Sequence, residues 1–297
     1  MWVWIKRGYA SSFCEGKKQS GRSKFLYDFW CIQYKGDAPY SPFHVPSPSG
    51  YAFWMAMSLF GGLVVLVGWM NGVSCKVALG WLCLGMSWTI HMLCADLITE
   101  SVYQGVQGKK VQCGFRHGFV LFLLSEFFFF FGFGWGFAAS AFCPPDAGGK
   151  RWPPVGIHTI HWATYPLVNT LLLVTTAFSL TWCHKALECG RLYESFWVLS
   201  TVIFQGGVFM YIQVKEFNMA SFTIADGIYG SAFFMLVGLH GLHVMVGLAS
   251  LSYGLIRMLF QHYSTERHAA FRFTIWYWHF VDVVWVGLYA FVYYLKS

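Results

Sequence analysis

Charged residues are scarce in this chain of 297 residues: Asp, Glu, Lys and Arg together make up only 11% of it. An ordinary soluble domain carries about a quarter of its residues as charges, so this chain has less than half of the usual share. Hydrophobic residues make up 57% of the chain, and its mean hydropathy is +0.50. This composition excludes an ordinary water-soluble domain and predicts a protein that lies within a lipid bilayer.

Paired cysteines are also missing from the sequence. The nine cysteines are scattered along the chain and form no C-x-x-C pair. This spacing favours neither a disulfide framework nor a thiolate metal site, so we interpret the cysteines as small apolar side chains. The formal net charge is +7, but basic loops in a membrane protein mark one side of the bilayer, and we expect no nucleic-acid partner.

Long runs with few or no charged residues fill most of the chain. Seven of them are long enough to cross ~30 Å of hydrocarbon as helices that rise ~1.5 Å per residue. Backbone polar groups in lipid must bond within their own segment, which favours helices. We therefore predict an all-α membrane protein with seven transmembrane helices, at about residues 51–70, 77–95, 118–143, 164–183, 195–214, 227–256 and 273–295.

A polar, glycine-rich segment at residues 96–117 separates the first two spans from the other five. This separation favours a two-plus-five bundle within one membrane domain at residues 44–297. Residues 1–43 differ from the rest, because they are basic with scattered serine and glycine, a composition similar to that of a transit peptide. We expect them to form a retained basic extension on the matrix side.

Lysine and arginine are distributed unequally between the two sides of the predicted bundle. The N-terminal segment and the loops after the second, fourth and sixth spans carry fifteen of them, and the opposite side carries five. Basic loops stay on the cytoplasmic or matrix side of a membrane. We therefore predict that the N-terminus lies on that side and that the C-terminus lies across the membrane.

Few ionisable groups fall inside the predicted spans. Glu126 interrupts a run rich in phenylalanine, and Asp282 lies at a similar depth in the last span. His279 precedes Asp282 by three positions, and His240 and His243 are also three apart, so each pair shares one helix face. We interpret these five residues as a polar layer inside an apolar bundle.

Three functions are compatible with this polar layer. Its members can pair between helices as structural contacts, or intramembrane carboxylates can relay protons. Histidines can also ligate haem or copper. Ligation needs histidines from several helices, whereas the closely spaced pair His240 and His243 belongs to one.

Several motifs of the chain resemble those of cytochrome c oxidase subunit III. The most specific are "DGIYGS" and "WYWHFVDVVW", and the resemblance covers about residues 44–297. In chain order the motifs are "GFRHGFVLFLLSE" at 114–126, "RWPPVGI" at 151–157, "PLVNTLLL" at 166–173, "TWCHK" at 181–185, "FTIADGIYGSAFF" at 222–234, "GLHGLHVMVG" at 238–247 and "WYWHFVDVVW" at 276–285.

The resemblance implies a core subunit of a haem–copper oxidase in the mitochondrial inner membrane, which supports oxygen reduction by cytochrome c and proton pumping. In that family the subunit is non-catalytic and binds no metal. Haem a, haem a3 and copper belong to subunits I and II, which are its partners together with accessory subunits. The family fold packs against subunit I and holds phospholipids in a cleft between the first two helices and the other five.

The resemblance also implies roles for individual residues. Glu126 falls on the family's carbodiimide-reactive intramembrane glutamate, with His243 as its partner. Lipid-binding positions of the family fall on Glu100, Arg116, Arg257, His262 and His268. Histidine or arginine of the family pattern is replaced at Ala95, Val106, Gln107, Ala139, Lys185 and Arg267.

A stand-alone intramembrane transporter is the alternative, with Glu126 and Asp282 as proton-coupling groups. Many secondary transporters are built from inverted repeats and contain broken helices. The sequence shows neither feature. We therefore expect an oxidase subunit.

Overall fold

The computed structural model describes residues 49–74, 76–144, 150–265 and 268–294, except for the side chains of Lys76 and Tyr103. The extension predicted at residues 1–43 lies outside this part of the chain. The described residues form helices and connecting loops, without strands. The helices are α2 (Tyr51–Met70), α3 (Lys76–Ile98), α4 (Lys109–Phe142), α5 (Tyr165–Glu188), α6 (Leu192–Met219), α7 (Gly227–Leu259) and α8 (Ala269–Leu288).

Two short π-helices continue these helices: η2 (Thr99–Tyr103) follows α3, and η4 (Tyr289–Tyr294) follows α8. With these extensions, seven helices of the described residues are long and apolar enough to cross a membrane. The prediction of an all-α membrane protein with seven spans is therefore confirmed.

Several helices extend beyond the apolar runs of the sequence. Helix α4 begins at Lys109 and has 34 residues, a length of about 51 Å at the usual helical rise. Helix α6 ends at Met219, so that Lys215 and Glu216 are helical although they follow the predicted span. An apolar run in the sequence marks only the part of a helix that lies in hydrocarbon, where charged residues are excluded. Helical hydrogen bonding continues beyond it into the membrane interface.

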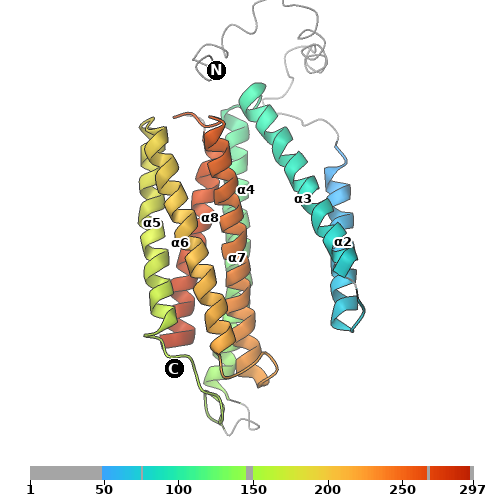
Figure 1. Cartoon of the computed structure of the whole chain (residues 1–297), viewed down its shortest axis with the longest axis vertical. Helices are drawn as coiled ribbons and strands as arrows, with labels where there is room; N and C mark the ends of the chain where they lie inside the picture. The colour runs from blue at the N-terminus through green and yellow to red at the C-terminus, as the bar shows by residue number, and fades with distance from the viewer. Residues whose placement is uncertain (1–48, 75, 145–149, 266–267, 295–297) are drawn as a thin grey trace, which may run out of the picture. The chain divides into compact units, whose positions relative to one another are not determined.

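The helices pack in two groups (Figure 1). Helices α2 and α3 pack against each other. Helices α4 to α8 form the second group, in which α5 contacts α6 and α8, and α7 contacts α4, α6 and α8. At the end of α3, Cys94 lies close to the side chains of Tyr253 and Arg257 in α7. This grouping agrees with the two-plus-five arrangement expected from the sequence.

Tryptophans of α8 form the centre of the five-helix group. Trp278 and Trp285 are fully buried, and their indole N–H groups donate hydrogen bonds of 3.0 Å to Thr176 and Thr170 of α5. Buried indoles need such partners, because an unpaired N–H in an apolar core is costly. These two bonds fix the rotation of α8 relative to α5.

Two glycines allow the neighbouring helices to approach Trp278. A Cβ atom added at Gly206 of α6 would lie 2.6 Å from Leu248 and 2.9 Å from Trp278. One added at Gly247 of α7 would lie 2.9 Å from the same indole. Close approach of this kind is the usual role of glycine between membrane helices.

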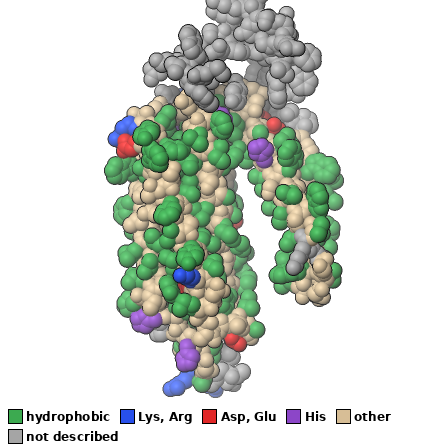
Figure 2. Space-filling view, in the orientation of Figure 1, with side chains coloured by type: hydrophobic (Ala, Val, Ile, Leu, Met, Phe, Trp, Pro, Cys, Tyr) green, Lys and Arg blue, Asp and Glu red, His purple; other side chains and the backbone are tan. Residues whose placement is uncertain are grey.

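The outer surface of the helices is apolar. Figure 2 shows hydrophobic side chains over the visible faces of the helices, with charged side chains and histidines mainly toward the helix ends. No residue of α2 is buried within the chain, although the helix is strongly hydrophobic. A surface of this kind suits contact with lipid or with other membrane subunits.

Candidate functional site

Glu126 of α4 and His243 of α7 form a direct contact across two helices. Glu126 Oε2 lies 2.8 Å from His243 Nε2. His243 Nδ1 lies 2.8 Å from the carbonyl oxygen of Leu239, to which only an N–H can donate. If His243 is neutral, its Nε2 accepts a proton from a protonated Glu126; if it is charged, Nε2–H donates to a carboxylate. In both states the pair shares one proton along a single hydrogen bond.

Aromatic rings surround this pair. The ring of Phe130 lies 4.8 Å from that of His243, and the ring of Tyr277 stacks at 6.4 Å. The side chain of Glu126 is 23% exposed. The neighbouring Phe127 and Phe128 are exposed on the apolar outer face of α4. The carboxyl group therefore pairs inside the bundle while remaining close to its outer surface.

The other members of the predicted polar layer do not join this pair. His240 is fully buried, and its ring lies 5.0 Å from that of Trp285 without a hydrogen bond to any described residue. Asp282 Oδ2 lies 3.8 Å from His279 Nδ1, which is longer than a hydrogen bond. The structure thus separates the layer into the pair Glu126 and His243, the longer contact in α8, and an isolated histidine.

A second polar cluster, which the sequence prediction missed, lies between α5, α6 and η4. The hydroxyl group of Tyr293 donates to Glu216 Oε1 at 2.5 Å, and Asn169 Nδ2 donates to Gln213 Oε1 at 3.2 Å. Glu216 is 1% exposed and Asn169 is fully buried. This cluster is therefore buried more completely than Glu126.

The position of Glu216 explains why it was missed. The predicted span ended at residue 214, and a carboxylate beyond a span is normally assumed to face water. A signal was nevertheless present, because Gln213 and Glu216 are three residues apart and share one face of the extended helix α6. The polar Asn169 within the apolar run of α5 was a second signal.

The predicted lipid-binding residues have different local contacts. Arg257 is largely buried at the end of α7, and its guanidinium carbon lies 4.6 Å from the centre of the Tyr263 ring. Burial, together with the positive charge of Arg257, lowers the pKa of His262, and burial raises the pKa of Tyr263 to about 12. Both groups are therefore neutral near pH 7. Glu100 is partly buried in η2, beyond the end of α3.

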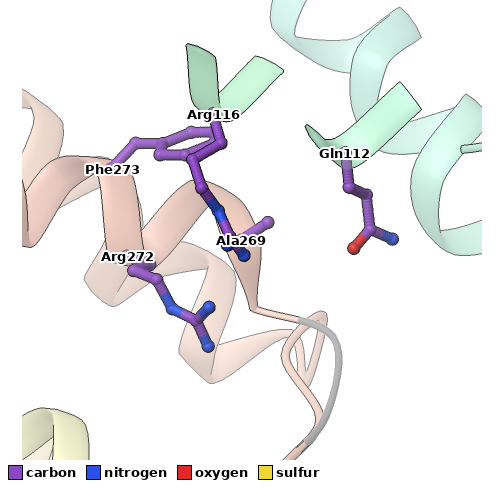
Figure 3. A pocket seen from close by; sticks show the side chains of 5 residues that line it. All are labelled: Gln112, Arg116, Ala269, Arg272 and Phe273. Carbon is purple, nitrogen blue, oxygen red and sulfur yellow. The ribbon is translucent and has the colours of Figure 1, made fainter. Parts of the chain in front are cut away.

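His268, before the first residue of α8, belongs to a different set of contacts. Its Nε2 atom lies 3.2 Å from His184 Nε2 of α5 and 3.3 Å from Arg272 Nη2. Its Nδ1 atom lies 3.1 Å from the carbonyl oxygen of Ser264. Arg116 lies in a pocket with Arg272, which the sequence prediction did not single out (Figure 3). Arg272 therefore lies beside both Arg116 and His268, and the lipid-binding role of the five residues stays a prediction.

Within the described part of the chain, one group of side chains has the spacing of metal ligands. One possible ligand atom from each of His184, Glu188 and His268 lies within 4.8 Å of the others. However, Arg272 donates to the same His268 nitrogen that a metal would need, and Lys185 Nζ lies 3.0 Å from Glu188 Oε2. We interpret the group as a network of hydrogen bonds and ion pairs; the expected absence of metal stays a prediction.

Comparison with known proteins agrees with the seven apolar helices. The family model of cytochrome c oxidase subunit III matches residues 41–297. Cytochrome c oxidase subunit 3 of Papio hamadryas is 39% identical over 258 residues, which cover 86% of this chain and 97% of the relative. The protein of the same name from Branchiostoma lanceolatum is 38% identical with the same coverage, and that of Sus scrofa is 40% identical over 70% of this chain and 80% of the relative. The chain therefore belongs to the cytochrome c oxidase subunit III family.

Proposed function

We propose that this chain is a non-catalytic core subunit of cytochrome c oxidase in the mitochondrial inner membrane. It would assemble with subunits I and II, which hold haem a, haem a3 and copper, and with accessory subunits. The family match over nearly the whole membrane region carries this proposal. Within each of the two polar clusters inside the bundle, side chains form hydrogen bonds with one another, which supports a structural and proton-holding role.

Purification of the chain in a mild detergent tests the proposed assembly. We expect haem a and subunits I and II to co-purify with a tag on this chain, with the absorption spectrum of the oxidase. A chain that purifies alone, without haem, would contradict the assignment and would favour a separate transporter. Metal analysis of the isolated chain should find no stoichiometric copper, iron or zinc.

The proposed orientation places the N-terminus in the matrix. It is supported by the fifteen basic residues on that side against five on the other. A protease added to mitoplasts, in which the outer membrane has been removed and the inner membrane is intact, should remove a tag at the C-terminus. It should spare a tag at the N-terminus. The opposite pattern would reverse the proposed orientation.

Glu126 and His243 would support proton uptake as a proton-holding pair. The pair can exchange between a neutral and a charged state by moving one proton along a 2.8 Å hydrogen bond. Neither state changes the total charge, so the proton can move without placing a net charge in the apolar surroundings. Time-resolved proton uptake by the assembled oxidase should slow modestly in Glu126→Gln.

Phospholipid would bind near Arg257 and His262, close to the end of α3. A buried guanidinium suits the phosphate of a lipid headgroup, because it can form charge-assisted hydrogen bonds. In addition, Arg257 Nε is buried without a hydrogen-bond partner in the described structure. The complex with Arg257→Gln should retain less phospholipid by mass spectrometry than the unchanged complex.

A further inference from the structure

The buried polar cluster between α5, α6 and η4 contains three atoms that the described chain does not satisfy. Its side chains are those of Asn169, Gln213, Glu216 and Tyr293, and none of them is more than 2% exposed. Asn169 Oδ1, Gln213 Nε2 and Glu216 Oε2 are covered and have no hydrogen-bond partner among the described residues. Unpaired polar atoms are costly away from water, so three of them in one cluster indicate that a further group binds there.

The three atoms belong to groups that lie against one another. Asn169 Nδ2 donates to Gln213 Oε1 at 3.2 Å, so the remaining polar atom of each amide lies close to this bond. The side chain of Gln213 also lies close enough to Glu216 and Tyr293 to interact with both. The hydroxyl group of Tyr293 donates to Glu216 Oε1, which leaves Oε2 as the unpaired oxygen of the carboxyl group. The amide of Gln213 is therefore the centre of the cluster.

The hydrogen-bonding roles of the three atoms match those of one water molecule. Asn169 Oδ1 and an ionised Glu216 Oε2 accept hydrogen bonds, whereas Gln213 Nε2 donates them. A water molecule can donate two hydrogen bonds and accept two, so it can pair with all three atoms at once. If Glu216 is protonated at Oε2, the acid donates to the water instead, and the water still donates to Asn169.

This match does not depend on how the two amides are oriented. If both amides are reversed, Gln213 Nε2 donates to Asn169 Oδ1, and Asn169 Nδ2 and Gln213 Oε1 become the unpaired atoms. The set again contains one N–H donor among acceptors. A cation needs oxygen ligands and would lie against that N–H group, whereas an anion would lie against the carboxyl group. The chemistry therefore favours a neutral ligand that both donates and accepts hydrogen bonds.

We propose that a single bound water molecule bridges α5 and α6 through Asn169, Gln213 and Glu216. It would hold the second oxygen of Glu216 while the hydroxyl group of Tyr293 holds the first. A water molecule with three polar partners is part of the structure and is costly to remove. The site does not depend on the function proposed above.

X-ray radiolysis of the assembled complex, followed by mass spectrometry, tests whether water is present in the cluster. Radiolysis converts water to hydroxyl radicals, which modify a buried side chain only where a bound water molecule lies beside it. We expect hydroxylation of Tyr293, although this residue is only 2% exposed, and none of Phe271, which is fully buried near the other end of α8. A Tyr293 ring that stays as unmodified as Phe271 would show that the proposal is wrong.

Two matched variants of α6 identify the atoms that hold the water. Gln213→Leu removes the donor at the centre of the cluster and should lower the hydroxylation of Tyr293 about tenfold, as expected for the loss of one hydrogen bond. Gln205→Leu makes the same change about two turns earlier in α6, outside the cluster, and should leave the hydroxylation unchanged. Equal hydroxylation of Tyr293 in the Gln213→Leu complex and in the unchanged complex would contradict the site.

A cryo-EM map of the unchanged complex tests the site without any substitution, which covers the case of a Gln213→Leu variant that fails to assemble. At a resolution that shows other internal waters, we expect one density peak at about 3 Å from polar atoms of Asn169, Gln213 and Glu216. Direct contacts between these side chains, without a peak, would overturn the proposal. A peak that depends on added calcium, with oxygen distances of about 2.4 Å, would assign the cluster to a cation and would also overturn it.

Discussion

Glu126 and Glu216 are two intramembrane carboxyl groups with different environments. Glu126 interrupts an apolar run of α4, yet its side chain is 23% exposed, and it pairs with His243. Glu216 follows the apolar run of α6, yet it is 1% exposed and accepts a hydrogen bond from Tyr293. The apolar character of the neighbouring residues in the sequence therefore does not predict how deeply a carboxyl group is buried.

The partners of the two groups differ as well. An imidazole can take up a proton near neutral pH, whereas a tyrosine hydroxyl group normally remains protonated and donates. Glu126 therefore has a partner with which it can exchange a proton, and Glu216 has one that holds it in place. This contrast suggests a functional role for the first cluster and a structural role for the second.

The largest difference should appear in chemical labelling by an apolar carbodiimide. Such a reagent reaches carboxyl groups through lipid and reacts with the protonated acid. We expect it to label the peptide that contains Glu126 and to leave the peptide that contains Glu216 unlabelled, because only the first is near the outer surface. Mass spectrometry of the digested complex measures both peptides at once. Equal labelling would show that burial does not distinguish the two groups.

Removal of the buried carboxyl group should have the largest effect on stability. Glu216→Ala leaves the hydroxyl group of Tyr293 buried without its acceptor, and we expect a loss of about 2 kcal/mol in the free energy of unfolding. Glu216→Gln keeps an oxygen acceptor and should lose less than about 1 kcal/mol. Unfolding of the purified chain in mixed detergent micelles compares the variants. A larger loss for Gln than for Ala would contradict the structural role.

The pair of Glu126 and His243 should contribute less to stability. A double-mutant cycle with Glu126→Ala and His243→Ala should give a coupling energy of about 1 kcal/mol, in the range measured between membrane helices. Oxygen consumption by the assembled Glu126→Gln complex should remain largely intact, because we assign no redox centre to this chain. Loss of nearly all activity in that assembled variant would show that the supporting role is wrong.

The smallest effect is expected at Asp282. Neither of its carboxyl oxygens has a hydrogen-bond partner among the described residues, and the contact with His279 is 3.8 Å long. Asp282→Asn should therefore change the free energy of unfolding by less than the ~0.5 kcal/mol that a weak hydrogen bond contributes. The same unfolding assay measures this variant. A loss as large as that of Glu216→Ala would reveal a partner outside this chain.

The number and order of the membrane helices could be predicted from local features of the sequence. A run of about twenty apolar residues must be helical in lipid whatever its neighbours are, because its backbone groups have no other partners. The grouping of two and five helices also followed from one polar segment between residues 96 and 117. The ends of the helices were less certain, because helical hydrogen bonding does not stop where the apolar run stops.

The pairing of side chains across helices depended on the packed structure. Sequence spacing placed His240 and His243 on one face, yet one contacts Trp285 and the other contacts Glu126. Which residue meets which partner depends on how each helix is rotated, and close packing of Gly206 and Gly247 around Trp278 contributes to that rotation. Composition and apolar length therefore decide that this chain crosses a membrane seven times. Its polar clusters, by contrast, form only where residues distant in sequence are packed together, since hydrogen bonds act over about 3 Å.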